Sequence, residues 1–212
     1  GSSDLIFPVP LAMASSWDTA LVERAARISA DEASADGLDW VYSPMVDVTR
    51  DPRWGRVVEG AGEDAWLGQR FARAYVRGSQ GSDLASDSSV MACVKHFALY
   101  GAVEGGREYN VVDMSRRRME EDYLPPYKAA VDAGVGSVMT SFNTIDGIPA
   151  TGDRWLLTRL LRDQWHFKGF VVTDYNAVTE LINHGVAADK AEASRLALSA
   201  GADLDMMGSA YI

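Results

Sequence analysis

The chain has 212 residues, of which 47% are hydrophobic and 24% are charged, the usual composition of a globular protein. Its 20 basic and 30 acidic residues leave a net charge of −10, so nucleic acid and anionic membrane surfaces are poor partners. The single cysteine, Cys93, excludes an internal disulfide, and the 3 scattered histidines argue against a metal site. No stretch approaches the ~18 apolar residues of a membrane span, and no signal peptide is visible.

Short apolar or β-branched runs predict strands, and the amphipathic stretches between them predict helices. The predicted strands cover residues 7–13, 40–48, 90–99, 135–142, 169–173 and 202–207. The predicted helices cover residues 17–35, 65–78, 115–133, 154–165, 177–184 and 190–200. Ser15 or Ser16 is expected to cap the first helix, and Gly134, Gly185 and Gly201 are expected to end three others. Apolar strands separated by helices indicate a parallel sheet that is covered on both faces.

Two architectures fit this alternation, a (β/α) barrel and a doubly wound sheet. The segments after the strands are long and polar, as after Val48 and Leu99, whereas the segments before the strands are short. No GxGxxG motif follows the first predicted strand, which weakens a dinucleotide-binding sheet. We therefore predict an α/β fold of the TIM-barrel type, with about six of the eight strand–helix units in residues 1–212. The pattern opens on a strand and stops after one, so we expect an incomplete barrel domain.

Charged side chains gather where the predicted strands end, which is the end at which such barrels build active sites. Lys95 and His96 lie toward the end of the third predicted strand, Asp174 follows the fifth, and Arg56 lies in the loop after the second. These donors can bind the hydroxyl groups of a neutral, polyhydroxylated ligand and keep a carboxylate ionised. An ionised Asp174 could then attack an anomeric carbon, with Tyr175 beside it as an aromatic surface for a sugar ring.

Each of these residues also has a structural interpretation. Lys95 could pair with an aspartate, and Asp174 could cap the helix that follows it. The carboxylates at 59, 63 and 64 could neutralise the arginines at 50, 53 and 56. Glu104 and Glu108 flank two glycines, which indicates a mobile loop rather than a fixed acid.

Several segments, spread over nearly the whole chain, form a specific pattern when they are taken together. They are FPVPLAMASSW at residues 7–17, PMVDVTRDPRWGR at 44–56, GED at 62–64, VKHFA at 94–98, GGREYN at 105–110 and GFVVTD at 169–174. This pattern resembles glycoside hydrolase family 3, close to bacterial β-glucosidases. The resemblance implies a (β/α)₈ barrel followed by an α/β sandwich domain. It places the first strand, the last barrel unit and the sandwich domain outside residues 1–212.

The resemblance also implies roles for individual residues. Asp174 matches the nucleophile of a retaining exo-acting β-glucosidase, and Arg56, Lys95 and His96 match residues that bind glucose hydroxyls. The general acid/base would be a glutamate outside this chain. Such an enzyme needs no cofactor or metal.

Three apolar or aromatic residues match positions that surround the sugar in the family. Met139 and Phe142 fall where the family has a methionine and usually a tyrosine, so Phe142 lacks that hydroxyl. Tyr175 stands where a tryptophan is common and retains an aromatic ring at the next subsite.

A β-xylosidase is the nearest alternative enzyme, because xylose differs from glucose only at the exocyclic CH₂OH group. A catalytically incomplete barrel fragment is a second alternative, of a different class. The expected partner is a small carbohydrate such as a β-glucoside or a cello-oligosaccharide, and a homodimer is left open. Family resemblance favours a periplasmic or secreted location.

Overall fold

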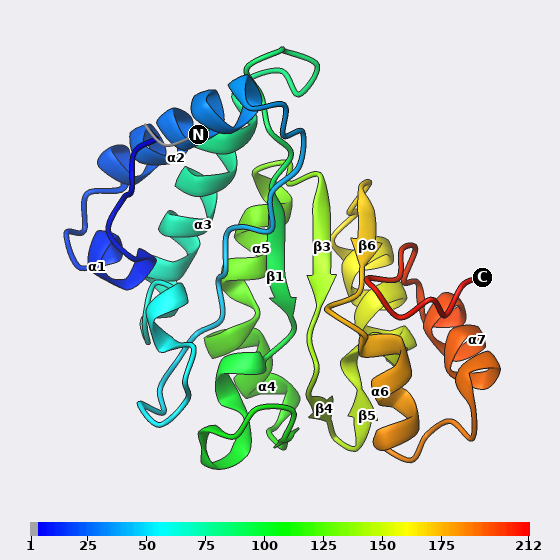
Figure 1. Ribbon diagram of the computed structural model, residues 1–212. Helices are drawn as coiled ribbons and strands as arrows, with labels where there is room; N and C mark the ends of the chain where they lie inside the picture. Colours follow the sequence, from blue (N-terminus) through cyan, green and yellow to red (C-terminus); the bar gives the residue numbers. More distant parts are fainter. Residues whose placement is uncertain (1–3) are drawn as a thin grey trace.

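The computed structural model describes residues 4–212, an α/β arrangement with parallel strands between helices (Figure 1). The strands are β1 (Cys93–Phe97), β2 (Val111–Val112), β3 (Ser137–Thr140), β4 (Thr144–Ile145), β5 (Ile148–Pro149) and β6 (Phe170–Val172). The α-helices are α1 (Pro10–Ala14), α2 (Thr19–Ala35), α3 (Ala65–Gln80), α4 (Arg116–Arg118), α5 (Pro125–Asp132), α6 (Ala177–Asn183) and α7 (Lys190–Ala200). The 3₁₀ turns are Val57–Glu59, Tyr100–Ala102, Glu104–Gly106 and Ala150–Gly152, and the π-helical segments are Met119–Tyr123 and Trp155–Gln164.

The main sheet is parallel, with the order β1–β3–β6. An extended segment that includes Trp40 runs beside β1 and pairs with Met91, and a second one pairs Leu204 with Val172 of β6. The predictions of strands at 90–99, 135–142 and 169–173 are therefore confirmed in shortened form. Residues 40–48 and 202–207 are extended but form only isolated bridges. Within residues 4–212 these five neighbouring segments form an open, parallel array and do not close into a barrel.

The prediction of a strand at residues 7–13 is wrong, because this segment leads into helix α1. Pro10 occupies the first turn of α1, where its missing N–H has no helical partner to lose and its fixed φ suits the helix. In a paired strand, Pro8 and Pro10 would each withhold a hydrogen-bond donor from the ladder. Proline chemistry outweighs the apolar pattern here.

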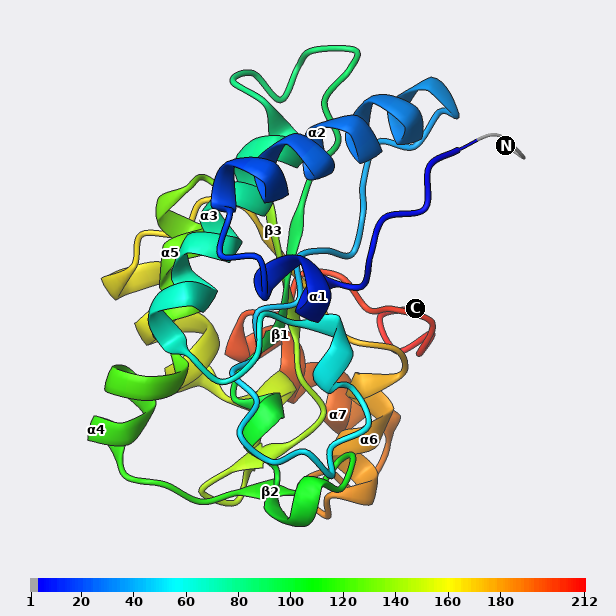
Figure 2. The same ribbon diagram turned by 90° about the vertical axis from the view of Figure 1, so that its left-hand side faces the viewer.

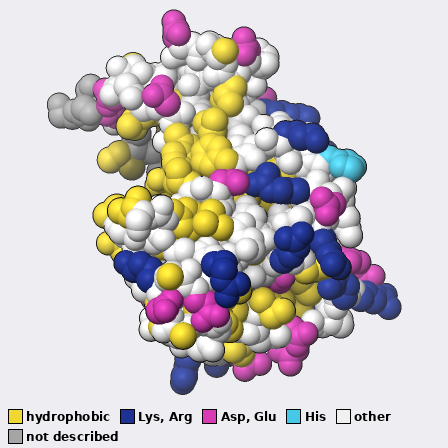
Figure 3. Space-filling view, turned by 90° about the vertical axis from the view of Figure 1, so that its right-hand side faces the viewer, with side chains coloured by type: hydrophobic (Ala, Val, Ile, Leu, Met, Phe, Trp, Pro, Cys, Tyr) yellow, Lys and Arg dark blue, Asp and Glu magenta, His cyan; other side chains and the backbone are white. Residues whose placement is uncertain are grey.

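Side chains alternate between the two faces of the main sheet. Val94, Val138 and Val171 belong to the large core under the helices. Cys93 and Met139 form a smaller cluster with their neighbours on the other face. Figure 2 shows α1, α2 and α3 in front of the strands, and the view from the side of β6 and α7 shows hydrophobic side chains gathered in its upper part (Figure 3).

Helix α2 confirms the first predicted helix but not its cap. Asp18 is the N-cap, and its Oδ1 accepts the N–H of Leu21 at 2.9 Å. The hydroxyls of Ser15 and Ser16 instead donate to carbonyl groups of α1. Aspartate at this position also places a negative charge at the positive end of the helix dipole.

The prediction of one regular helix at residues 115–133 is only partly confirmed. The stretch forms α4, a π-helical segment and α5 in succession, with Pro125 at the start of α5. Proline cannot donate the hydrogen bond that a regular helix requires at that position. The predicted helix ends hold, since Gly134, Gly185 and Gly201 have φ values of 85°, 75° and 116°.

A second small sheet joins the loops that follow β1 and β3, and the sequence analysis does not anticipate it. Strand β2 pairs in parallel with β4, and β4 turns back into β5. Asp146 and Gly147 make this turn with positive φ values of 50° and 80°, as a type I′ hairpin requires. The Asp-Gly pair is a hairpin signal, and the turn links two loops near the carboxyl ends of the main strands.

Candidate active site

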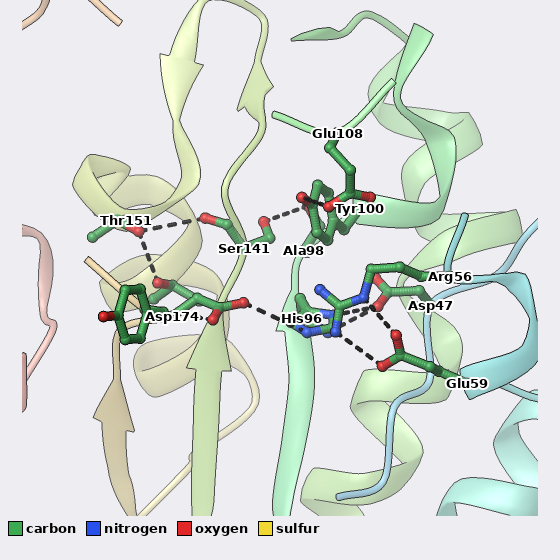
Figure 4. Close-up of polar contacts among 12 residues, drawn as sticks. Asp47, Arg56, Glu59, His96, Ala98, Tyr100, Glu108, Ser141, Thr151 and Asp174 are labelled. Atoms are coloured by element: carbon green, nitrogen blue, oxygen red, sulfur yellow. Dashed lines mark hydrogen bonds and ion pairs between the residues drawn. The ribbon is translucent and has the colours of Figure 1, made fainter. Parts of the chain in front are cut away.

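Two carboxylates and an imidazole meet at the carboxyl ends of the main strands (Figure 4). His96 Nδ1 lies 2.9 Å from Asp47 Oδ2, and His96 Nε2 lies 3.5 Å from Asp174 Oδ2. The His96 side chain is 1% exposed, and that of Asp174 is 12% exposed. Asp47 comes from the extended segment 40–48, His96 from β1 and Asp174 from the residues just after β6. Three segments that are far apart in the sequence therefore meet at this point.

His96 is held from one side by a fully buried carboxylate. Asp47 Oδ2 also accepts the backbone N–H of His96 at 3.0 Å. Since a carboxylate only accepts, Nδ1 carries the hydrogen between these two side chains, and Nε2 is left facing Asp174. The Tyr127 hydroxyl contacts Asp47 Oδ1 and lies 2.8 Å from the His96 carbonyl oxygen. Burial raises the pKa of Tyr127 well above its ordinary value, and the charge of Asp47 acts in the same direction, so the phenol keeps its proton.

Asp174 has one restrained oxygen and one free oxygen. Its Oδ1 accepts the N–H of Tyr175 at 2.6 Å. Its Oδ2 is buried and has no hydrogen-bond partner among residues 4–212. A buried, unpartnered carboxylate oxygen is unfavourable unless a ligand or a reaction uses it. This oxygen is the strongest functional signal in the site.

Arg56 supplies positive charge next to the same cluster. Its Nε and its terminal nitrogen bind the two oxygens of Glu59 at 2.7 and 2.9 Å, a bidentate pair. Burial lowers the pKa of Arg56, but the bonds to Glu59 and the charges of Asp47 and Asp174 outweigh burial and raise it overall. The hydrogen bonds from Arg56 lower the pKa of Glu59, against the effect of its partial burial.

Lys95 points to a neighbouring pocket rather than to a charged partner. It lines a pocket of about 170 Å³ together with Glu59, Tyr42, Tyr75 and other residues. In the described part of the chain its ammonium group forms no ion pair and no side-chain hydrogen bond. Residues 4–212 therefore provide no structural Lys–Asp pair for Lys95. Lys95 is available to a ligand at the edge of the site.

The three apolar and aromatic candidates occupy different layers. Met139 is 2% exposed and packs with Cys93 and Val172 on the sheet face away from the main core. Phe142 is 7% exposed and lies between other aromatic rings at the end of β3. Tyr175 is 61% exposed beside Asp174. The structure thus brings Asp174, His96 and Arg56 together, with Tyr175 beside them and Met139 deeper in the sheet.

The remaining structural alternatives give mixed outcomes. Asp174 does not cap helix α6, because Asn176 is the N-cap and no side chain caps this helix. Among the carboxylates expected to neutralise the arginine-rich loop, Glu59 pairs with Arg56, whereas Glu63 forms no ion pair within residues 4–212 and raises the pKa of Arg50 only through its charge. Asp64 instead caps α3 through the N–H of Leu67 at 2.6 Å. The other arginines of the loop pair elsewhere, Arg50 with Asp122 and Arg53 with Asp51.

Sequence reasoning missed the residues that support the site from behind. The sequence pattern gives Asp47 no role, although it is the buried partner of His96. The glycines beside Glu108 predict a mobile loop, yet its carboxylate accepts hydrogen bonds from Trp54 Nε1 and from the Tyr100 hydroxyl, which lies beside it in Figure 4. No local pattern predicts these contacts, because the partners are far apart in the sequence or face each other only in the fold.

No group of three or more His, Cys, Asp or Glu side chains in residues 4–212 is arranged to hold a metal ion. In the same range no helix has both the length and the apolar character needed to cross a bilayer.

Carboxylates, an imidazole and a guanidinium lie together at the carboxyl ends of parallel strands. This arrangement is typical of α/β enzymes that bind polar organic ligands. Comparison with known proteins identifies the family. The family model for the glycosyl hydrolase family 3 N terminal domain matches residues 1–212. The chain belongs to glycosyl hydrolase family 3, as the sequence motifs predicted.

Individual relatives carry more specific names. The chain is 53% identical over 206 residues to a periplasmic beta-glucosidase of Salmonella typhimurium strain LT2, covering 97% of this chain and 27% of that protein. It is 41% identical over 207 residues to a beta-xylosidase of Formosa agariphila, covering 95% and 29%. The crystal structure of a beta-glucosidase from Listeria innocua in complex with glucose has a TM-score of 0.94 and 47% identity, covering 98% and 29%. The chain thus spans less than a third of each of these relatives.

Proposed function

We propose that the full-length protein is a retaining, exo-acting β-glucosidase that hydrolyses terminal β-D-glucosyl residues of glucosides and oligosaccharides. The observation that carries this proposal is the buried Oδ2 of Asp174, which has no hydrogen-bond partner in residues 4–212 and faces His96. The beta-glucosidases from Salmonella and Listeria support the choice of a glucoside substrate.

In the proposed first step, Asp174 Oδ2 forms a bond to the anomeric carbon while the bond from that carbon to the leaving-group oxygen breaks. A glutamic acid outside this chain donates a proton to the leaving oxygen. Water then attacks the glycosyl-enzyme, returns a proton to the glutamate and releases the sugar with its configuration retained. The N–H of Tyr175 holds Oδ1 at 2.6 Å, which orients Oδ2 for the attack.

The proposed sugar site uses the polar side chains around Asp174. Arg56 and Lys95 donate hydrogen bonds to sugar hydroxyls, and His96 Nε2 accepts one, because the hydrogen of the imidazole is on Nδ1. The Asp47 and Glu59 carboxylates hold the His96 and Arg56 side chains in place.

The apolar walls of the proposed site come from Met139, Phe142 and Tyr175. Met139 and Phe142 contact the sugar in subsite −1. Tyr175 is the exposed aromatic surface for the group at the next subsite.

The proposed function requires more protein than residues 1–212. A retaining enzyme needs two catalytic carboxyl groups ≈ 5–5.5 Å apart, the nucleophile and the acid/base. In this chain only the nucleophile, Asp174, is proposed. We propose that the first strand and the last barrel unit lie outside residues 1–212 and help to complete the barrel, and that a C-terminal α/β sandwich domain supplies the glutamate. An isolated chain of 212 residues is then expected to be catalytically incomplete.

A covalent trap tests the proposal. The full-length enzyme is incubated with a 2-deoxy-2-fluoro-β-glucoside, and its intact mass and peptides are measured. A gain of one fluoroglucosyl unit on the peptide that contains Asp174 is expected. Labelling of another carboxylate, or full turnover by the Asp174→Asn enzyme, contradicts the assignment. The same reagent on the isolated 212-residue chain is expected to add no mass.

A β-xylosidase is the second candidate, and the beta-xylosidase relative from Formosa agariphila favours it. The ratio of kcat/KM for an aryl β-glucoside to that for the matching aryl β-xyloside separates the two. A ratio above one supports the glucosidase, and a ratio below one supports the xylosidase.

The relatives also support two proposals about the protein in the cell. We propose a periplasmic or secreted location, in line with the relative from Salmonella, and small β-glucosides or cello-oligosaccharides as partners. Fractionation of the source cells tests the location, and light scattering of the full-length protein tests whether it is a homodimer.

A further inference from the structure

The ring of Tyr100 packs behind the proposed sugar site. Its ring is fully buried at 0% exposure and lies in the 3₁₀ turn after β1. The ring centroid is 5.4 Å from that of His96 and 5.8 Å from that of Phe142. The guanidinium carbon of Arg56 lies 5.8 Å from the same centroid. One side chain therefore contacts three of the residues assigned to the sugar.

The hydroxyl of Tyr100 is bound by a loop that the family assignment leaves without a role. Glu108 accepts hydrogen bonds from this hydroxyl and from the buried indole Nε1 of Trp54. Bonds to an ionised acceptor are about twice as strong as neutral ones. Glu108 itself belongs to an exposed segment, so its carboxylate reaches inward to two buried rings.

The loop around Glu108 is docked closely on the chain that carries Trp54. Gly105 and Gly106 have φ values of 65° and 66°, a conformation suited to glycine. A Cβ on Gly106 would lie 2.7 Å from the backbone nitrogen of Trp54. Tyr109, which follows Glu108, is 46% exposed, and its ring centroid lies 4.6 Å from that of Phe142. Glu108 thus binds the Tyr100 hydroxyl and is followed by a ring that contacts Phe142 at the exposed edge of the site.

We propose that Glu108 and Tyr100 act as a pair of positioning residues, in which the carboxylate pins the Tyr100 ring and the ring sets His96, Arg56 and Phe142 for the sugar. The proposal rests on the proposed function. Without the Glu108 bond, the ring is free to shift, and a displacement on the order of 1 Å can lower the rate about 100-fold. Burial raises the pKa of the Tyr100 phenol and the bond to Glu108 raises it further, so the hydroxyl remains a donor.

The test uses Tyr100→Phe, Glu108→Gln, Glu108→Ala and the double variant Tyr100→Phe/Glu108→Ala in the full-length enzyme. The Kd for the sugar product, kcat/KM and Tm are measured for each. We expect Tyr100→Phe and Glu108→Ala each to raise the Kd for the sugar about tenfold. In the double variant the Kd is expected to rise by less than the product of these two factors. Glu108→Gln, which retains an acceptor, is expected to restore part of the loss.

The control is Tyr211→Phe, which removes a hydroxyl that donates to the Ala202 carbonyl at 3.2 Å. It is expected to leave the Kd unchanged. A fall in Tm with an unchanged Kd in both Tyr100→Phe and Glu108→Ala overturns the proposal, and so do strictly multiplicative effects in the double variant.

A second measurement does not depend on substrate. Trypsin cleavage after Arg107 in the folded enzyme reports the opening of the loop, and the Tyr100→Phe enzyme keeps the Arg107–Glu108 bond unchanged. Cleavage is expected to be several times faster than in the wild type and in Tyr211→Phe, and equal rates count against the pair. If the wild type binds no sugar, the proposed function fails and the sugar-positioning role fails with it. If the wild type binds sugar and the variants match it, only the pair is wrong.

Discussion

The two ends of the same strands are built in opposite ways. At the amino ends, backbones approach so closely that a Cβ on Gly169 would lie 2.0 Å from the Gly136 carbonyl oxygen. At the carboxyl ends, the buried groups are polar, with Asp47 and His96 both 1% exposed. The first end gains stability from close packing, whereas the second holds polar groups whose burial is unfavourable without partners.

This difference predicts which property a substitution changes first, stability at the amino ends and activity at the carboxyl ends. The amino ends tolerate no added volume, but they contain no group of the proposed chemistry. The carboxyl ends depend on hydrogen bonds that specific side chains supply, so isosteric changes there should alter activity before they alter the fold.

The largest effect is expected from Gly169→Ala at the amino end. The new methyl group would overlap the backbone of Gly136 and the ring of Phe167, so the strands must separate. We expect a loss of about 3 kcal/mol or a failure to fold. Denaturant unfolding of the full-length protein measures it, with Gly55→Ala as control, because a Cβ on Gly55 meets no atom within 4 Å. Equal stability of the two variants would contradict the proposed tight contact.

The next effect is expected from Asp47→Ala at the carboxyl end. The change leaves Nδ1 and the backbone N–H of His96 without their acceptor in a buried site, and the Tyr127 hydroxyl keeps only the His96 carbonyl oxygen. We expect kcat/KM to fall about 100-fold, since His96 is then free to turn, and stability to fall by about 3 kcal/mol. The control is Asp51→Ala, which removes a carboxylate that pairs with the neighbouring Arg53. Unchanged kcat/KM in Asp47→Ala would show that His96 needs no partner.

A third variant separates stability from activity on one strand. Val138 of β3 is fully buried on the face under the helices, one residue before Met139. Val138→Ala should lower the free energy of unfolding by about 2 kcal/mol and leave KM unchanged. Thermal unfolding and steady-state kinetics of the full-length enzyme check both parts. A raised KM would mean that the two faces of the sheet are coupled.

The smallest effect concerns pH and the Arg56–Glu59 pair. Hydrogen bonds from Arg56 hold the pKa of Glu59 below its ordinary value of 4.5. A lowered pKa means that the stabilisation is present above pH 4.5 and is lost as the pH falls through the folded-state pKa. The Glu59 side chain is 37% exposed, so solvent screening keeps the contribution to about 0.5 kcal/mol.

Glu59→Gln should therefore reduce the free energy of unfolding near pH 7 and match the wild type near pH 3. Urea unfolding at both pH values measures the difference. Glu63→Gln is the control, because Glu63 is exposed in the same loop and no ion pair joins it to another residue of the range 4–212. A difference that persists at pH 3 would rule out the charge of Glu59 as its cause.

Several elements could be predicted because they depend on local chemistry. The helices that become α2, α3, α6 and α7 follow from periodicity, and the glycines at 134, 185 and 201 mark chain reversals. Residues 7–13 could not be assigned from their apolar pattern, because the prolines decide between a strand and helix α1. The break within residues 115–133 has the same cause.

The site divides along a similar line. Asp174, His96 and Arg56 could be expected to lie together from the strand ends and the family motifs, and the structure places them together. Glu108 could not, because the glycines beside it indicate freedom, whereas the Trp54 and Tyr100 donors that restrain it come from other segments.

The sequence alone determined the family, the alternation of strands and helices, and the residue types that carry the chemistry, because each of these is written in local patterns and motifs. Only the tertiary structure decided which groups are partners. Asp47 faces His96 across 49 positions of the sequence, and the Oδ2 of Asp174 is left without a hydrogen bond in the described chain. Burial and hydrogen-bond satisfaction depend on what surrounds a side chain, and those surroundings exist only when distant segments pack together.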